Sequence, residues 1–138
     1  MAAEVKSELD RLLREEKIAW LTTMRGDGMP QPAPVWFLWQ DSRFLIYSQP
    51  EAKRIRNIAN NPRVAINLNS DLWGNHVVVI TGMASVDANA TPANEVPAYL
   101  EKYHEGILQI EMTPESMAKE YSTAIHVTPA WIRHEVTG

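Results

Sequence analysis

Three prolines occupy every second position just before an apolar run, in the segment Pro30-Gln31-Pro32-Ala33-Pro34-Val35-Trp36-Phe37-Leu38-Trp39. This alternation is typical of a strand, but proline has no N–H to donate to a β-ladder. The proline-rich half must therefore lie at the edge of a sheet or face something other than a neighbouring strand. Two interpretations remain open: this half packs on a flat ligand, or the prolines protect an exposed edge from aggregation.

The rest of the chain reads mostly as short strands joined by turns. Further strands are expected at residues 18–24, 44–47, 63–68, 76–86, 123–127 and 131–135, with Pro129 separating the last two. Turn signals at residues 25–28 and 40–43 predict hairpins. Gly82 predicts a bulge or a close backbone approach within its strand. Six or seven strands joined mainly by hairpins favour a small β-barrel.

A few helices are expected around this sheet. The first carries one apolar stripe of Val5, Leu9, Leu12 and Leu13 at helical spacing. A second, over residues 52–60, turns Ile55, Ile58 and Ala59 inward and ends at Pro62. Two more begin at Thr91-Pro92 and Thr113-Pro114, each an N-cap followed by proline, and Gly106 ends the earlier one.

Composition narrows the class of protein. The 138 residues predict one domain, residues 1–138, large enough for a core of its own. The chain has no cysteine, which excludes thiolate metal sites and thiol nucleophiles and fits a cytoplasmic location. A net charge of −4 argues against nucleic acid as a partner. The charged N-terminus and the lack of a long apolar run argue against a signal peptide or a membrane span.

Common catalytic motifs are missing from the sequence. The four histidines, His76, His104, His126 and His134, show no metal-ligand spacing, so no metal is predicted. There is no P-loop, no complete dinucleotide fingerprint and no Gly-x-Ser-x-Gly elbow. The catalytic residues therefore stay unknown. Tyr47, His76 and Tyr121 could protonate a product, but a buried, hydrogen-bonded structural role is the commoner one for such side chains, and solvent could equally supply the proton.

Positive charge gathers in one short stretch of this acidic chain. Four of the thirteen basic residues, Lys53, Arg54, Arg56 and Arg63, lie within eleven positions. Lys53 and Arg54 fall in the first turn of the expected helix, where the helix dipole disfavours cations. A phosphate held by the helix N-terminus, by these side chains and by Ser48 would resolve the conflict. The alternative is a solvated basic face partnered by Glu51.

Five tryptophans offer candidate walls for a ligand. Most are expected in the core. Trp73 is the exception, because it lies in a polar stretch beside Gly74 and Asn75, where a large ring often borders a flat ligand. Trp36 is a second candidate.

The run YSQPEAKRIRNIANNPR at residues 47–63 resembles the phosphate-binding strand, loop and helix of the pyridoxamine 5′-phosphate oxidase-like flavin-binding split barrels. The turn at residues 27–30 and the segment 125–129 are also similar, so the resemblance spans roughly residues 8–135. It implies a mainly β fold, a six-stranded antiparallel split β-barrel with peripheral helices, and a homodimer with cofactor sites between the subunits. The cofactor-binding residues that it implies are Gln31, Pro32, Pro34 and Trp36 along the ring, Trp73 beside it, and Ser48, Lys53, Arg54 and, more weakly, Arg56 at the phosphate.

Two departures narrow the subgroup that the resemblance implies. Ala33 and Leu38 stand about where FMN oxidases of the family carry an arginine and a lysine, and residues 126–131 lack both arginines of the oxidase C-terminal pattern. Oxidation of pyridoxamine phosphate is therefore not expected.

The pairs Pro30-Gln31 and Arg56-Asn57 look more like the branch that uses coenzyme F-420, a deazaflavin with an anionic tail that Arg56 and Arg63 could bind. This implies hydride transfer from the reduced deazaflavin to an activated C=C or C=N bond of a small organic substrate. An FMN-binding oxidoreductase and a non-catalytic flavin or deazaflavin binder are the alternatives.

Overall fold

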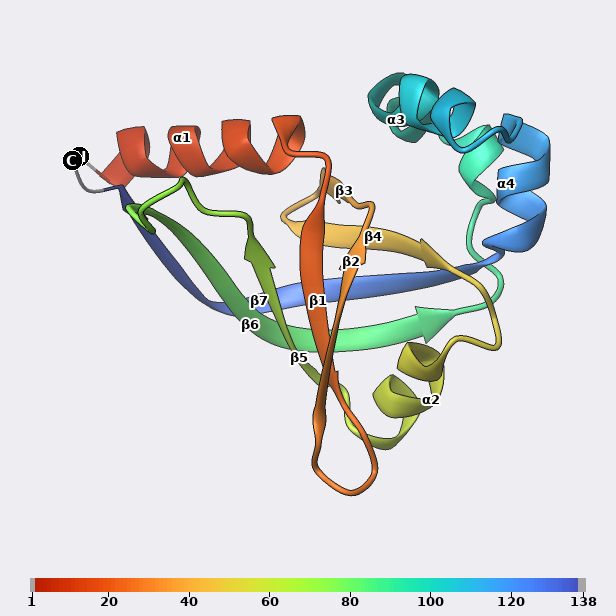
Figure 1. Ribbon diagram of the computed structural model, residues 1–138, viewed down its shortest axis with the longest axis horizontal. Coiled ribbons are helices and arrows are strands. Elements are labelled where there is room, and N and C mark those ends of the chain that lie inside the picture. Colours follow the sequence, from red (N-terminus) through yellow and green to blue (C-terminus); the bar gives the residue numbers. More distant parts are fainter. Residues whose placement is uncertain (1, 137–138) are drawn as a thin grey trace.

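The computed structural model describes the backbone of residues 2–136 and the side chains of residues 7–136. Seven strands in this part of the chain form one antiparallel sheet in the order β2-β1-β5-β6-β7-β4-β3, which curves into a half-barrel with helices around it (Figure 1). The elements are α1 (Ala2–Glu15), β1 (Ala19–Met24), β2 (Pro30–Val35), β3 (Leu38–Gln40), β4 (Arg43–Ser48), α2 (Lys53–Asn60), β5 (Arg63–Leu68), β6 (His76–Asp87), the 3-10 helix η1 (Ala93–Glu95), α3 (Pro97–Gln109), α4 (Pro114–Glu120) and β7 (Thr123–Val136). No helix in this part of the chain is long and apolar enough to cross a bilayer.

The mainly β class is confirmed, but the expected count of six strands is wrong. The proline segment does not form one strand, because β2 pairs with β1 while β3 pairs with β4 at the other end of the sheet order. Trp36 and Phe37 carry the chain between them. β2 is an edge strand, as the prolines predicted: it lies at one end of the strand order and pairs with β1 along its inner side.

The expected break at Pro129 does not occur, since β7 runs unbroken past it. Thr81 of β6 pairs with Trp131, whereas Gly82 pairs with Pro129, so Ala130 is an extra residue in the ladder. Proline is tolerated at such an irregularity, where a ladder hydrogen bond is already lost. The bulge predicted at Gly82 is thus confirmed.

The helices follow the sequence patterns in part. Leu9, Leu12 and Leu13 of α1 are buried as expected, and the side chain of Val5 lies outside the described residues. In α2, Ile58 is buried, but Ala59 is exposed and Asn57 takes the inward position. Asn57 Nδ2 donates to Thr23 Oγ1 at 3.0 Å and to Gln31 Oε1 at 2.8 Å, which ties α2 to β1 and β2.

Two expected helix boundaries are wrong. Residues after Thr91-Pro92 form only a 3-10 turn, and α3 begins at Pro97 with Val96 as a cap that makes no side-chain hydrogen bond. Gly106 does not end α3, which continues to Gln109. The Trp36 ring packs against Gly106, 3.0 Å from where a β-carbon would lie, so the glycine makes room for this contact. By contrast, the N-cap predicted at Thr113 is confirmed, and Thr113 also forms a reciprocal capping box with Ser116 at the start of α4.

The core has two parts. One lies inside the half-barrel under α1 and α2, and the other lies between β4 and the α3–α4 pair. Trp36 and Trp39 pack against these clusters, but Trp131, expected in the core, is 53% exposed on β7. Its partner in the ladder, Thr81 on β6, is exposed as well, so this face of the β6–β7 ladder is open to solvent here.

Candidate functional site

The N-terminus of α2 lies directly beyond β4, which ends at the fully buried Ser48. The helix has no side-chain cap at Ala52 and no acidic residue in its first turn. Its first amides, with the positive end of the helix dipole, are therefore left for water or an anion. The Ser48 hydroxyl donates to the Gln49 carbonyl at 3.0 Å and accepts from Arg54 Nη1 at 3.4 Å.

Arg54 is the central charge of this region. Burial lowers the pKa of its guanidinium, and the nearby Tyr121 hydroxyl opposes that shift. Among residues 7–136, no carboxylate lies within ion-pair distance of Arg54, and Glu51 pairs with neither Lys53 nor Arg54. A partly buried cation with only a long hydroxyl contact is poorly compensated, which makes this a favourable place for an anion.

A pocket of about 400 Å³ opens beside Arg54, between the barrel and the α3–α4 pair. Aromatic and aliphatic side chains make most of its wall. The lining residues are Ile18, Pro34, Val35, Trp36, Tyr47, Gln49, Ala52, Arg54, Tyr99, Ile110, Met117 and Tyr121. A mostly apolar pocket with one convergent charge is the usual form of a small-molecule site.

The structure brings some of the predicted cofactor residues to this pocket. Pro34, Trp36 and Arg54 line it, and Ser48 joins it through Arg54. The Trp36 ring also stacks on Tyr103, with ring centres 4.7 Å apart and planes 4° from parallel, so its orientation is held by the core.

The other predicted cofactor residues do not line the pocket. Gln31 is held by Asn57 and its neighbour Pro32 is exposed on β2, while Lys53 and Arg56 are exposed on α2. Trp73 is 80% exposed in the loop between β5 and β6 and does not line the pocket. In a single chain, Trp73 therefore borders no ligand there.

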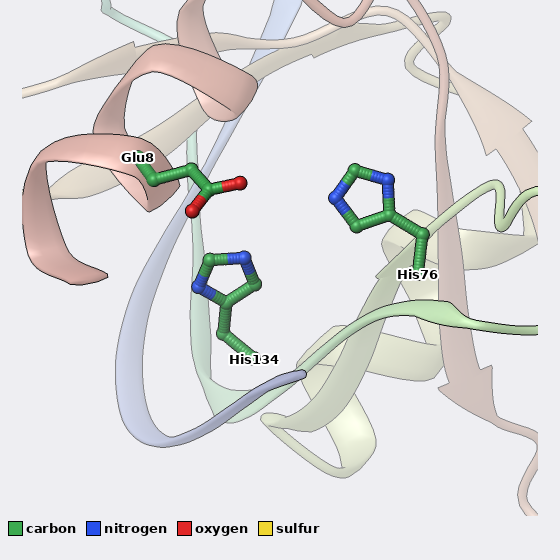
Figure 2. A group of neighbouring side chains, drawn as sticks. All are labelled: Glu8, His76 and His134. Atoms are coloured by element: carbon green, nitrogen blue, oxygen red, sulfur yellow. The ribbon is translucent and has the colours of Figure 1, made fainter. Parts of the chain in front are cut away.

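Of the proton-donor candidates, only two are at the pocket. Tyr47 and Tyr121 line it, and the Tyr47 hydroxyl donates to the Thr91 carbonyl at 2.7 Å. Burial raises the pKa of Tyr47 above its ordinary value. His76 lies near α1 instead, beside Glu8 and His134 (Figure 2).

The sequence patterns did not identify the outer wall of the pocket. Tyr99 comes from α3 and Met117 from α4, far along the chain from the basic cluster. Tyr99 and Tyr103 do recur at helical spacing, but that spacing indicates only an inward face. Docking of α3 and α4 beside β4 turns this face into a wall.

Comparison with known proteins places the fold. Solved structures with similar folds include a putative pyridoxamine 5′-phosphate oxidase from Listeria innocua (22% identity, 94% of this chain and 97% of that chain, TM-score 0.67). They also include an F420 reductase (22%, 90% and 94%, 0.66) and the heme storage protein HutZ from Vibrio cholerae (14%, 95% and 94%, 0.66). No curated protein matches the sequence.

A sequence-family model also matches nearly the whole chain. The family model described as pyridoxamine 5′-phosphate oxidase matches residues 5–135, which include all the described strands except the last residue of β7, most of the helices and every residue that lines the pocket. The chain therefore belongs to the pyridoxamine 5′-phosphate oxidase family.

Proposed function

We propose that this chain is a homodimeric oxidoreductase that binds coenzyme F-420 and acts on a small organic substrate. The observation that carries the proposal is the partly buried, unpaired Arg54 at the uncapped start of α2, inside a pocket with an aromatic wall. The bound cofactor would supply hydride to an activated C=C or C=N bond. The protein's own work would be binding, orientation and exclusion of water.

The residues present fit an anionic flavin-like group. The α2 amides and Arg54 offer donors to a phosphate, with Ser48 supporting Arg54 and the exposed ammonium of Lys53 within the same turn. The pocket wall at Pro34 and Trp36 offers apolar surface to a flat ring system.

The positions of the basic residues on this chain favour the deazaflavin over FMN. Ala33 and Leu38 cannot supply the two cations that FMN oxidases of this family carry there, and Leu38 is buried. Arg56 and Arg63 are exposed and, within residues 7–136, without carboxylate partners, so they remain available to an anionic tail.

Tyr121 is the side chain best placed to hold a proton near the pocket. Its ring lines the cavity and its hydroxyl acts on the charge of Arg54. Tyr47 already donates to a backbone carbonyl and serves as wall. Trp36, Tyr99 and Met117 would keep bulk water from the reacting bond.

Titration of the purified protein with F-420 and with FMN separates the main alternatives. Quenching of deazaflavin fluorescence at stoichiometric concentrations, with much weaker binding of FMN, is expected. Preference for FMN would identify a flavin oxidoreductase of the same fold. Binding of F-420 without hydride transfer to any of a panel of enones, imines and quinones would support a non-catalytic binder.

The double substitution Lys53→Ala/Arg54→Ala tests the phosphate assignment. Loss of two charge-assisted contacts should weaken cofactor binding about 100-fold, because each is worth about 1.5 kcal/mol or more. The control is Arg11→Ala/Arg14→Ala on the exposed face of α1, which removes the same charge away from the pocket. Equal affinities of the two double variants would refute the assignment.

A further inference from the structure

Three side chains from distant parts of the sequence meet where α1 covers the sheet. They are Glu8 on α1, His76 at the start of β6 and His134 near the end of β7. Figure 2 shows the carboxylate and the two imidazoles facing a common space. One ligand atom from each lies within 4.8 Å of the other two.

The sheet register explains why the two histidines share a face. His134 pairs with Val78 and His76 pairs with Val136, which makes the two histidines diagonal neighbours on β6 and β7. Their ring centres are 6.4 Å apart. Glu8 approaches from the helix above, one residue before the buried Leu9 that anchors α1 to the core.

Three of the four imidazole nitrogens in this cluster are buried and, among residues 7–136, without a hydrogen-bond partner: His76 Nε2, His134 Nδ1 and His134 Nε2. A buried polar atom without a partner costs about 1–3 kcal/mol. One ligand placed between the two rings would satisfy one nitrogen of each imidazole, His76 Nε2 and one of the two on His134. His126 Nδ1 is also unsatisfied but stands apart, near Asp87.

We propose that Glu8, His76 and His134 bind a divalent transition-metal ion of the Zn²⁺ class. Two neutral imidazoles and one carboxylate are a common zinc donor set, and imidazole favours zinc and its neighbours over magnesium or calcium. Ligand atoms around tetrahedral zinc lie roughly 3.3 Å apart, given bonds of about 2.0–2.1 Å, so small side-chain rotations would close the site. Water would take the fourth position.

Such an ion would tie α1 to the end of the β6–β7 ladder where β6 begins and β7 ends. α1 and α2 lie at different ends of the curved sheet (Figure 1), so the metal would act apart from the pocket at Arg54. The proposal is therefore independent of the proposed cofactor. The role of the metal ion would be to fasten α1 to the sheet rather than to catalyse a reaction.

The test uses the full chain stripped with a chelator and dialysed. In competition with a chromogenic indicator, the protein should bind one Zn²⁺ ion per chain. Co²⁺ bound in its place should give the intense visible absorption bands of a four-coordinate site. Zn²⁺ should also raise the unfolding temperature. Absence of stoichiometric Zn²⁺ binding, or the weak spectrum of six-coordinate Co²⁺, would overturn the proposal.

His134→Gln should weaken Zn²⁺ binding about 100-fold or more, since loss of even a supporting contact at such sites costs 10–100-fold. Glu8→Gln should weaken it as well and guards against misfolding, because Glu8 is only half-buried on a surface helix. His104→Gln, at an exposed position on α3, is the matched control. Unchanged affinity in His134→Gln and Glu8→Gln would overturn the proposal.

Discussion

Two neighbouring side chains of α3, Tyr103 and Lys102, hydrogen-bond the backbone where α3 meets the barrel. The Tyr103 hydroxyl accepts from the Phe37 amide at 2.8 Å and lies within hydrogen-bond distance of the Lys17 and Phe37 carbonyls. Next to it, Lys102 Nζ donates to the Phe37 carbonyl at 2.8 Å. Both side chains satisfy the backbone at Phe37, where the chain leaves β2 for β3, and so hold the turn that aims Trp36 into the pocket.

The buried position of Lys102 predicts how the stability of the protein depends on pH. Burial lowers the pKa of its ammonium to about 7, helped by Lys17 and opposed by Glu16. The unfolded chain keeps this proton up to about pH 10.4, so between the two values folding releases a proton and stability rises with pH. The contribution is complete above the unfolded pKa and is lost as pH falls toward 7.

Urea unfolding of the wild type and of Lys102→Met across this range measures the effect. The difference in unfolding free energy, wild type minus variant, should grow steadily from pH 7 to about pH 10. Parallel pH profiles would mean that Lys102 keeps an ordinary pKa in the folded state.

Among the elements, β6 and β7 form an antiparallel ladder although η1, α3 and α4 separate them in the sequence. They are the longest strands in the described part of the chain, and their bulge lies between Thr81 and Gly82. A β-carbon at Gly82 would stand 2.2 Å from the Thr128 carbonyl oxygen. Glycine is thus required for close approach, because the obstacle is backbone that cannot rotate away.

Gly82→Ala should therefore destabilise the protein by about 2–4 kcal/mol, at or above the usual cost of overpacking. Gly26→Ala in the β1–β2 turn is the control, since nothing lies within 4 Å of the added methyl. Its effect should stay within about 0.5 kcal/mol. Thermal and urea unfolding compare the two; similar stabilities would contradict the close approach at the bulge.

At the scale of the whole molecule, apolar surface remains uncovered on the outer β6–β7 ladder. On the face of β6 and β7 that carries the exposed Thr81, Met83 is 47% exposed and Trp131 53%. Together with a pocket open along one side of a single chain, this supports the proposed homodimer with shared cofactor sites.

Light scattering on the eluting protein should give twice the chain mass of 15.6 kDa. Trp131→Glu should shift the protein toward the monomer and weaken cofactor binding with it, because a charge would be buried in the interface. Leu108→Glu, on the exposed face of α3, is the control and should leave the dimer intact. A monomeric wild type would refute the dimer, and a dimeric Trp131→Glu would place the interface elsewhere.

Local sequence was sufficient where one residue's chemistry decides the backbone. The prolines of β2 placed it at an edge, Gly82 marked the bulge, and Thr113 marked the start of α4, since each effect acts within a few residues. The basic cluster was likewise readable, because helix register alone puts Lys53 and Arg54 in the first turn of α2.

Contacts between distant segments required the tertiary structure. The sequence around Trp36 does not predict that Gly106 packs on its ring. It also does not predict that Tyr99 and Met117 complete the pocket. The spacing of the histidines likewise gave no sign that His76 and His134 become neighbours of Glu8. The sequence by itself determined the edge strand, the bulge and the charge at the start of α2. Only the tertiary structure decided where the proline segment divides, that β7 continues past Pro129, and which distant side chains meet, because packing between segments far apart in the chain depends on the register of the whole fold.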